Sequence, residues 1–194
     1  MKLYIFDLDE TLFKTYDFLE DVGRLAKNKG YISAAEEKKA SEALKAYNAP
    51  DVLDTYAGIG LDEKKYMEVA NSLENSYLYE DAEGLKRFEH VFILTTGNPI
   101  LQKIKIQKSG LDYAYKIVEE DKAEYLGRII KDGVYPDYSD QSFDEIYLVD
   151  DKPKVLENAL KYPILKPVYI KRKGGKYYTD SFTKCDTITS LTQL

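Results

Sequence analysis

Two pairs of acidic residues follow apolar stretches of this 194-residue chain and could act on one ligand. Asp7 and Asp9 come just after the apolar run of residues 2–6, and Asp150 and Asp151 come just after residues 145–149. In an extended chain, residues two apart point to the same face. Carboxylates this close repel each other, and a bound hard cation such as Mg²⁺ relieves the repulsion. The two pairs could therefore converge on one cation, or Asp7 or Asp150 could instead cap the following helix or turn.

A second group of residues suits the binding of an anion. Thr95, Thr96 and Gly97 follow the apolar run of residues 91–95 and precede Pro99, which fits the first turn of a helix. A hydroxyl and free backbone N–H groups at the start of a helix make a cradle for phosphate. Capping of that helix is the alternative. Lys122 begins another helical pattern, where it could neutralise a phosphate or be a solvated helix residue.

The elements that must position these residues alternate between strands and helices. Apolar runs at residues 2–6, 91–95, 113–118 and 145–149, with a fifth candidate at 167–171, are typical of buried parallel strands. Helical patterns at residues 99–109 and 122–130 lie between them. This alternation predicts an α/β fold with a doubly wound, Rossmann-like parallel sheet. Ligands bind at the carboxyl ends of the strands in such sheets, where both acidic pairs lie.

One interval breaks this alternation. Helical patterns at residues 16–29, 34–47, 50–56 and 62–78 follow one another without a convincing strand. A crossover needs only one helix, so we expect residues 14–87 to form a small helical domain inserted into an α/β core of residues 1–13 and 88–194. The alternative is that these helices only cover the sheet.

Composition excludes several classes of function. A net charge of −6 and a pI near 5.0 argue against general affinity for nucleic acid or acidic membranes. No stretch has the roughly 20 apolar residues of a membrane span, and the N-terminus does not resemble a signal peptide. Single cysteine and histidine residues, Cys185 and His90, exclude a disulfide within the chain and a cysteine zinc site, and disfavour a Ser-His-Asp triad. We expect a cytoplasmic protein.

Taken in order, these motifs resemble those of the haloacid dehalogenase (HAD) superfamily of phosphatases and phosphotransferases. The first motif, Asp-x-Asp-x-Thr after an apolar strand, is matched by residues 7–11, DLDET. Thr95 matches the second motif, Lys122 matches the third, and the pair Asp150-Asp151 after Val149 matches the fourth. The run TTG with Gln102 and Lys105 after it resembles capped members of the superfamily, and the helical insertion lies where those members carry a cap.

The resemblance implies a mechanism and a role for each residue. Asp7 would be the nucleophile that forms an aspartyl-phosphate, and Asp9 would protonate the leaving alcohol and then activate water. Mg²⁺ would be held by the Asp7 carboxylate, the Asp9 backbone carbonyl and Asp150. The remaining assignments are phosphate binding by Thr95, Thr96, Gly97 and Lys122, and support from Thr11 and Asp151. The predicted function is Mg²⁺-dependent hydrolysis of a small phosphorylated metabolite, without nucleic-acid or membrane partners.

Several alternatives stay open at this stage. Lys105 and Lys116 are rivals of Lys122, and Glu10 occupies a position where many capped members have glycine. Dehalogenases of the superfamily lack the second aspartate, which disfavours carbon–halogen cleavage. Phosphomutase or phosphotransferase activity, a phosphoprotein substrate and a non-catalytic phosphate-binding module remain. The basic, aromatic stretch 171–178 allows a nucleic-acid end as substrate or forms a surface turn. Residues that could contact the substrate in the insertion are Tyr16, Tyr47, Tyr56 and Asn48.

Overall fold

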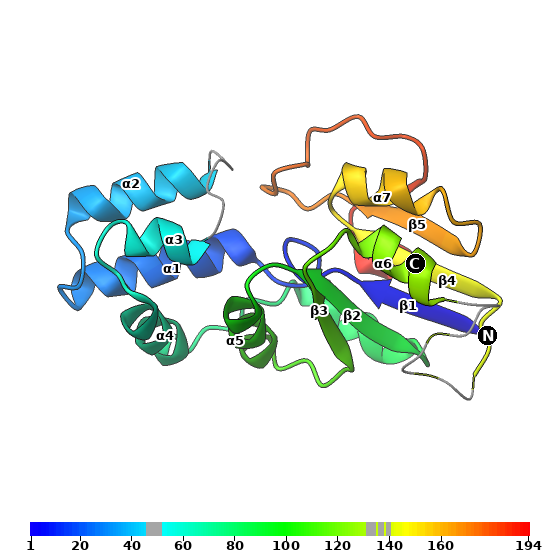
Figure 1. Ribbon diagram of the computed structural model, residues 1–194, viewed down its shortest axis with the longest axis horizontal. Helices are drawn as coiled ribbons and strands as arrows, with labels where there is room; N and C mark the ends of the chain where they lie inside the picture. The colour runs from blue at the N-terminus through cyan, green and yellow to red at the C-terminus, as the bar shows by residue number, and fades with distance from the viewer. Residues whose placement is uncertain (46–51, 131–134, 136–137, 139–140) are drawn as a thin grey trace.

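A computed structural model of the chain describes residues 1–45, 52–130, 135, 138 and 141–194. Its centre is a six-stranded parallel sheet with the strand order β3-β2-β1-β4-β5-β6 (Figure 1). The strands are β1 (Lys2–Phe6), β2 (Val91–Thr96), β3 (Tyr115–Val118), β4 (Glu145–Asp150), β5 (Leu165–Ile170) and β6 (Asp186–Ile188). This confirms the predicted fold class. The sequence did not predict β6, because it has only three residues and two of them are exposed.

Helices cover both faces of this sheet because side chains alternate along each strand. On β1, Leu3 and Ile5 belong to one buried cluster, together with residues of α6 (Lys122–Ile129) and α7 (Pro153–Ala159). Phe6 belongs to the other cluster, which α5 (Pro99–Ser109) and the 3₁₀ helices η1 (Glu80–Arg87) and η3 (Leu191–Gln193) help to build. α5 begins at a cap formed by Asn98 and ends at Gly110 with φ 66°, as Pro99 and Gly110 predicted.

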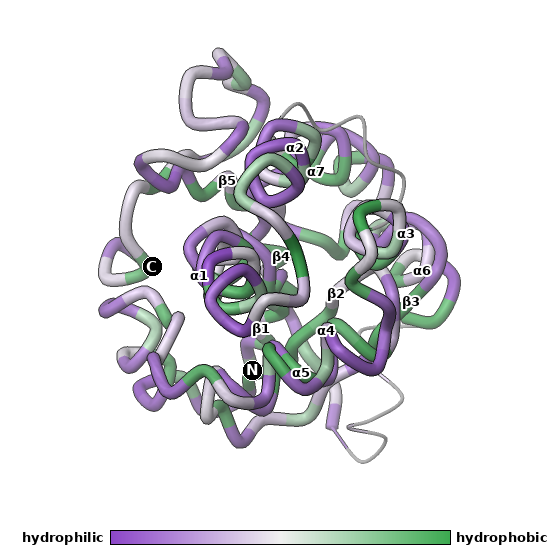
Figure 2. The backbone as a smooth tube through the Cα atoms, turned by 90° about the vertical axis from the view of Figure 1, so that its left-hand side faces the viewer, coloured by the Kyte–Doolittle hydropathy of each residue, from purple (hydrophilic) through white to green (hydrophobic). Residues whose placement is uncertain are grey.

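Four more helices lie beyond the carboxyl ends of the strands: α1 (Thr15–Asn28), α2 (Ala34–Lys45), α3 (Val52–Ala57) and α4 (Glu63–Ser72). Figure 2 views the molecule from this side and shows hydrophilic and hydrophobic stretches alternating along α1. The helical spacing of Leu19, Val22, Leu25 and Ala26 predicts one apolar face for α1; Leu19, Val22 and Ala26 are buried, as is Phe18, and Leu25 is partly buried. The predicted ends near residues 47 and 50 lie outside the described residues, as do Tyr47 and Asn48.

The prediction of one helix over residues 62–78 is too long. α4 ends at Ser72, and the chain then returns to the sheet, where Leu78 pairs with Phe13. The helical apolar spacing stops at Leu73, since residues 74–76 are polar and exposed. η1, which follows, contacts η3, and its Ala82 and Leu85 belong to the same buried cluster as Phe6 of β1. No helix in the described part of the chain is long and apolar enough to cross a bilayer.

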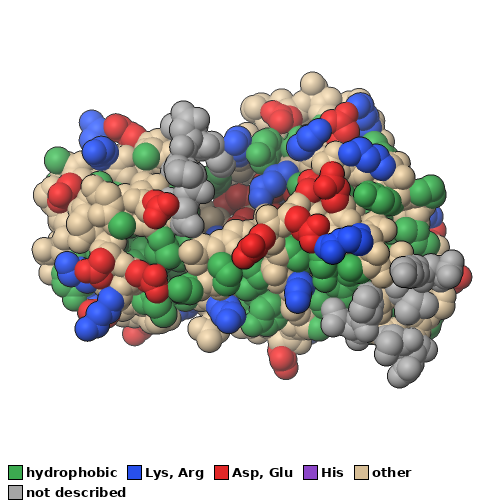
Figure 3. Space-filling model, in the orientation of Figure 1, with side chains coloured by type: hydrophobic (Ala, Val, Ile, Leu, Met, Phe, Trp, Pro, Cys, Tyr) green, Lys and Arg blue, Asp and Glu red, His purple; other side chains and the backbone are tan. Residues whose placement is uncertain are grey.

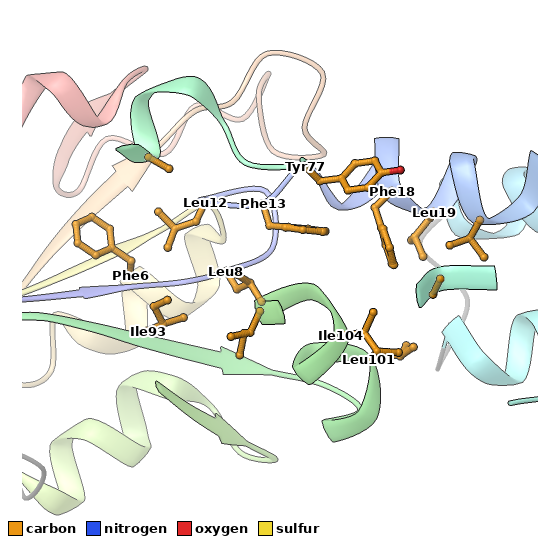
Figure 4. Packing of buried hydrophobic residues seen from close by; sticks show 14 of the residues in the cluster. Phe6, Leu8, Leu12, Phe13, Phe18, Leu19, Tyr77, Ile93, Leu101 and Ile104 are labelled. Carbon is orange, nitrogen blue, oxygen red and sulfur yellow. The ribbon is translucent and has the colours of Figure 1, made fainter. Parts of the chain in front are cut away.

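Two chain segments connect the sheet to these helices, and aromatic rings pack where the segments meet. The Phe13 and Phe18 ring centres are 5.5 Å apart, and those of Phe18 and Tyr77 are 5.2 Å apart. Figure 4 shows these side chains in one continuous row with Leu8 and Ile93 from the sheet side. This packing holds α1 above the carboxyl edge of the sheet, where the helix faces both acidic pairs.

Candidate active site

Asp7 lies at the carboxyl end of the central strand β1, beside Asp150 at the end of β4. The register pairs Phe6 with Val149, and the Asp7 backbone N–H donates to the Val149 carbonyl over 2.9 Å. Both aspartate side chains are fully enclosed. Lys122 Nζ lies between them, 2.6 Å from Asp7 Oδ1 and 2.5 Å from Asp150 Oδ2. Burial raises the pKa of Asp7 to about 6, although the Lys122 ammonium acts in the opposite direction.

Asp151 completes a buried acidic group with Asp7 and Asp150. Carboxylate oxygens of these three residues lie within 4.8 Å of one another. Asp7 Oδ2 and Asp151 Oδ1 are enclosed and have no hydrogen-bond partner among the described residues. Burial and the neighbouring carboxylates raise the pKa of Asp151. Three converging carboxylates with unpaired oxygens fit a hard divalent cation such as Mg²⁺.

The three candidate lysines differ in their burial and in their contacts with the aspartates. Lys122 is completely buried at the start of α6, where the Asp121 side chain accepts hydrogen bonds from the backbone N–H groups of Ala123 and Glu124. Burial lowers the pKa of Lys122, but Asp150 and Asp7 outweigh it, and the pKa is raised overall. Lys116 is exposed on the edge strand β3. Lys105 contacts Asp9 instead, so only Lys122 touches Asp7.

Asp9 has surroundings different from those of Asp7. Its Oδ1 accepts from Lys105 Nζ over 2.6 Å and from the Thr15 hydroxyl over 2.5 Å, and its Oδ2 accepts from Gln102 Nε2 over 2.8 Å. Burial alone would raise the pKa of Asp9, but the ammonium groups of Lys105 and Lys152 outweigh it and hold the pKa well below its usual range. Asp9 is therefore an ionised carboxylate that links the carboxyl edge of the sheet to α1 and α5.

The residues of the predicted anion cradle lie at the end of β2, directly before α5. Thr95 is fully buried, and its hydroxyl has no hydrogen-bond partner in the described part of the chain. Gly97 has φ 125°, and a Cβ there would lie 2.9 Å from Gln102 Nε2, so glycine is required. The Asn98 side chain caps α5, which leaves the Thr95 hydroxyl available for a ligand. Thr96, next to Gly97, also lines the site.

Thr11 closes the loop that follows the predicted nucleophile. Its hydroxyl is buried without a partner among the described residues, and its carbonyl accepts two hydrogen bonds from the Arg172 guanidinium. Arg172 also forms a two-bond ion pair with Asp81 and lies 4.1 Å from the centre of the Tyr79 ring. One member of the basic stretch 171–178 is therefore a buried anchor and not a surface group for nucleic acid.

A cavity of about 500 Å³ lies between the carboxyl edge of the sheet and the helices above it, and Asp9, Thr96, Gly97, Lys105 and Asp151 line it. Figure 3 shows this face hollowed between the two groups of elements, with acidic and basic side chains in the hollow. Thr15 and Lys152, which sequence reasoning did not assign, also line it, as do Lys176 and Tyr177 of the basic, aromatic stretch 171–178. Burial lowers the pKa of Lys152, but Asp7, Asp150, Asp9 and Asp151 outweigh it and raise the pKa overall. Its position directly after the second acidic pair was the signal that could have identified Lys152.

Comparison with known proteins gives matches only to solved structures. No family model matches the sequence, and no curated protein matches it. A haloacid dehalogenase-like hydrolase from Burkholderia xenovorans is 20% identical over 97% of this chain and 92% of its own, with a TM-score of 0.71. The HAD-hydrolase YfnB from Bacillus subtilis, bound to magnesium, is 15% identical over 99% and 96%, with a TM-score of 0.66.

An L-2-haloacid dehalogenase also matches, with 15% identity over 99% of this chain and 96% of its own, and a TM-score of 0.59. Because hydrolases and a dehalogenase share this architecture, the fold does not choose between their reactions. The resemblance predicted from the motifs is confirmed at the level of the fold: the chain has the fold of the haloacid dehalogenase-like hydrolases.

Proposed function

We propose that this chain is a Mg²⁺-dependent phosphomonoester hydrolase of the HAD superfamily, acting on a small phosphorylated metabolite. The observation that carries the proposal is the buried group of Asp7, Asp150 and Asp151, whose oxygens lie within 4.8 Å of one another beside Lys122. We further propose that residues 14–87 act as a helical cap over a core of residues 1–13 and 88–194. α1–α3 line the cavity opposite the acidic residues, which supports a small enclosed substrate over a protein surface.

In the first chemical step, a carboxylate oxygen of Asp7 attacks the phosphorus atom. The bond from phosphorus to the leaving oxygen breaks, and an aspartyl-phosphate forms on Asp7. Lys122 Nζ and the Thr95 hydroxyl bind the equatorial phosphoryl oxygens, where negative charge gathers. The backbone at Thr96 and Gly97, at the start of α5, completes the cradle. Asp9 gives a proton to the leaving oxygen, so the product is an alcohol.

In the second step, the ionised Asp9 takes a proton from water, and that water attacks the phosphorus atom. The bond between Asp7 and phosphorus breaks, which releases inorganic phosphate and restores the carboxylate. The contacts of Asp9 with Lys105, Gln102 and Thr15 keep it ionised, the form that can accept a proton, but the same contacts weaken it as a base. The first step needs Asp9 protonated, so we infer that these contacts loosen when substrate enters.

Asp7, Asp150 and the Asp9 carbonyl would hold Mg²⁺, with Asp151 beside them, and the bound cation would screen the attacking carboxylate from the phosphate dianion. Cleavage of a carbon–halogen bond makes different demands on the active site. Halide is a stable anion that needs no proton, and a haloacid brings no phosphate charge to the nucleophile. The second aspartate and the buried acidic group therefore favour phosphate chemistry over dehalogenation.

The test is hydrolysis of p-nitrophenyl phosphate by the purified protein with Mg²⁺ and with excess chelator. We expect turnover with Mg²⁺, and a fall of about a thousandfold after chelation, because the cation stabilises the transition state by several kcal/mol. Lys122→Met should remove most activity, whereas Lys116→Met, an exposed lysine of the adjacent strand, should leave it unchanged. Absence of turnover in the wild type, or equal rates for the two lysine variants, would contradict the proposal.

A further inference from the structure

The loop after β5 is held in a fixed position at the entrance of the cavity. The Tyr169 hydroxyl donates to the Tyr177 carbonyl over 2.5 Å, and Lys171 Nζ donates to the Asp180 carbonyl over 2.6 Å. Tyr169 pairs with Asp150 in the sheet, so the strand end that carries the candidate metal ligand also holds this loop. Arg172 ties its first residues to the nucleophile loop through the Thr11 carbonyl. These hydrogen bonds therefore hold the loop as one wall of the candidate site.

The lining of the cavity is chemically mixed. Asp9, Asp151, Lys105 and Lys152 are among the charged residues that line it. Aliphatic and aromatic side chains of α1, α2, α3, α5 and the loop after β5 also line it: Tyr16, Leu19, Leu44, Val52, Leu101 and Tyr177. A phosphoryl group fills only a small part of about 500 Å³, so the rest is available to the leaving group.

Three polar side chains of this cavity, those of Glu10, Asn98 and Thr15, are engaged with the protein. Both carboxylate oxygens of Glu10 accept hydrogen bonds, from the Tyr16 N–H and from the Tyr79 hydroxyl. Asn98 Oδ1 accepts two backbone N–H groups of α5, and the Thr15 hydroxyl donates to Asp9. A leaving group rich in hydroxyls would lose water on entering the cavity and would find these three side chains already paired.

From these observations we infer that the leaving group carries a planar or apolar part, which contacts Tyr177 of the core and Leu19 of α1. The inference rests on the phosphohydrolase function proposed above and specifies its substrate class. A bare polyol phosphate lacks the surface that these walls would bury. A phosphate ester with a ring system beyond the sugar or directly on the ester oxygen gains apolar burial and contact with the Tyr177 ring.

The experiment uses two phosphates that differ by one ring system: ribose 5-phosphate and adenosine 5′-monophosphate. We expect kcat/KM to be at least about tenfold higher for the nucleotide, the size of the usual stacking contribution of a base on an aromatic side chain. Tyr177→Ala should reduce this preference about tenfold, mainly through KM. Tyr178→Ala is the matched control, because Tyr178 is the next residue, is 43% exposed and does not line the cavity.

The possible failures can be told apart by adding p-nitrophenyl phosphate as a third substrate. Equal kcat/KM for the nucleotide and the sugar phosphate, with turnover of the third substrate intact, would overturn this inference and leave the proposed function standing. Equal effects of Tyr177→Ala and Tyr178→Ala would also overturn it. No turnover of any of the three phosphates would overturn the proposed function, and the inference with it. Circular dichroism melting of both variants checks that they fold.

Discussion

Glu10 should make the stability of this protein fall as pH rises through neutrality. Its backbone has φ 53°, a left-handed conformation that explains why many proteins with this motif have glycine here. Its side chain is only 7% exposed, and its two oxygens accept hydrogen bonds from the Tyr16 N–H over 3.0 Å and from the Tyr79 hydroxyl over 2.8 Å. Burial raises the pKa of Glu10 from 4.5 to about 7, although the Tyr79 hydrogen bond acts in the opposite direction.

The direction of this change in stability follows from proton binding in the folded and the unfolded states. Below about pH 4.5 the Glu10 carboxyl is protonated in both the folded and the unfolded chain. Between about pH 4.5 and 7 the folded state keeps the proton while the unfolded state loses it, so the free energy of unfolding decreases as pH rises. The two pKa values differ by about 2.5, and at about 1.4 kcal/mol per unit the decrease reaches at most about 3 kcal/mol. Glu10→Gln removes this titration.

The assay is urea unfolding of the wild type and of Glu10→Gln at several pH values from 4.5 to 8.5, with a chelator present so that bound metal does not contribute. The difference in free energy of unfolding should move in favour of the variant by about 2–3 kcal/mol across this range. Glu83→Gln, at an exposed position of η1, is the control and should stay parallel to the wild type. Parallel curves for Glu10→Gln would refute the reasoning.

Three further predictions follow from single contacts. Asp7→Asn should lower turnover of p-nitrophenyl phosphate at least about a thousandfold while leaving the far-ultraviolet circular dichroism unchanged, and retained turnover would exclude Asp7 as nucleophile. Arg172→Met should cost about 3–5 kcal/mol in urea unfolding because it leaves a carboxylate without its buried ion-pair partner, whereas Lys173→Met, at the exposed neighbouring position, should cost little. Gly127→Ala should cost about 1–3 kcal/mol because its Cβ would lie 2.1 Å from the Tyr162 ring, and a second change, Tyr162→Leu, should reduce that cost.

Sequence reasoning located the main strands because a buried parallel strand has one clear signal, an apolar run bounded by polar residues. β1 was predicted with its observed bounds, and β2 and β4 differ from prediction by one residue at their ends. β5 begins two residues earlier than expected, at Leu165, and ends at Ile170. β6 and α7 have three and seven residues, too few for a periodic pattern to be recognised.

The candidate site was predictable to the extent that it depends on strand ends. Parallel strands bring their carboxyl ends to one edge, so Asp7, Thr95 and Asp150 had to meet there once the strands were assigned. The sequence favoured Lys122 but did not exclude Lys105 and Lys116, since all three precede the fourth strand. The three-dimensional arrangement separates them, because the start of α6 places Lys122 Nζ between Asp7 and Asp150.

The two aspartates of the first motif show where the pattern of residues stops being informative. An extended chain would send Asp7 and Asp9 to the same face, but β1 ends at Phe6, and the Leu8 carbonyl then accepts N–H groups of a tight loop. Asp7 consequently enters the buried acidic group, while Asp9 turns towards Lys105 on α5. Burial raises the pKa of the first, and the nearby ammonium groups lower that of the second. Two identical side chains two residues apart thus acquire opposite pKa shifts, because one is enclosed among carboxylates and the other lies beside two ammonium groups, a difference that residue type and spacing alone do not encode.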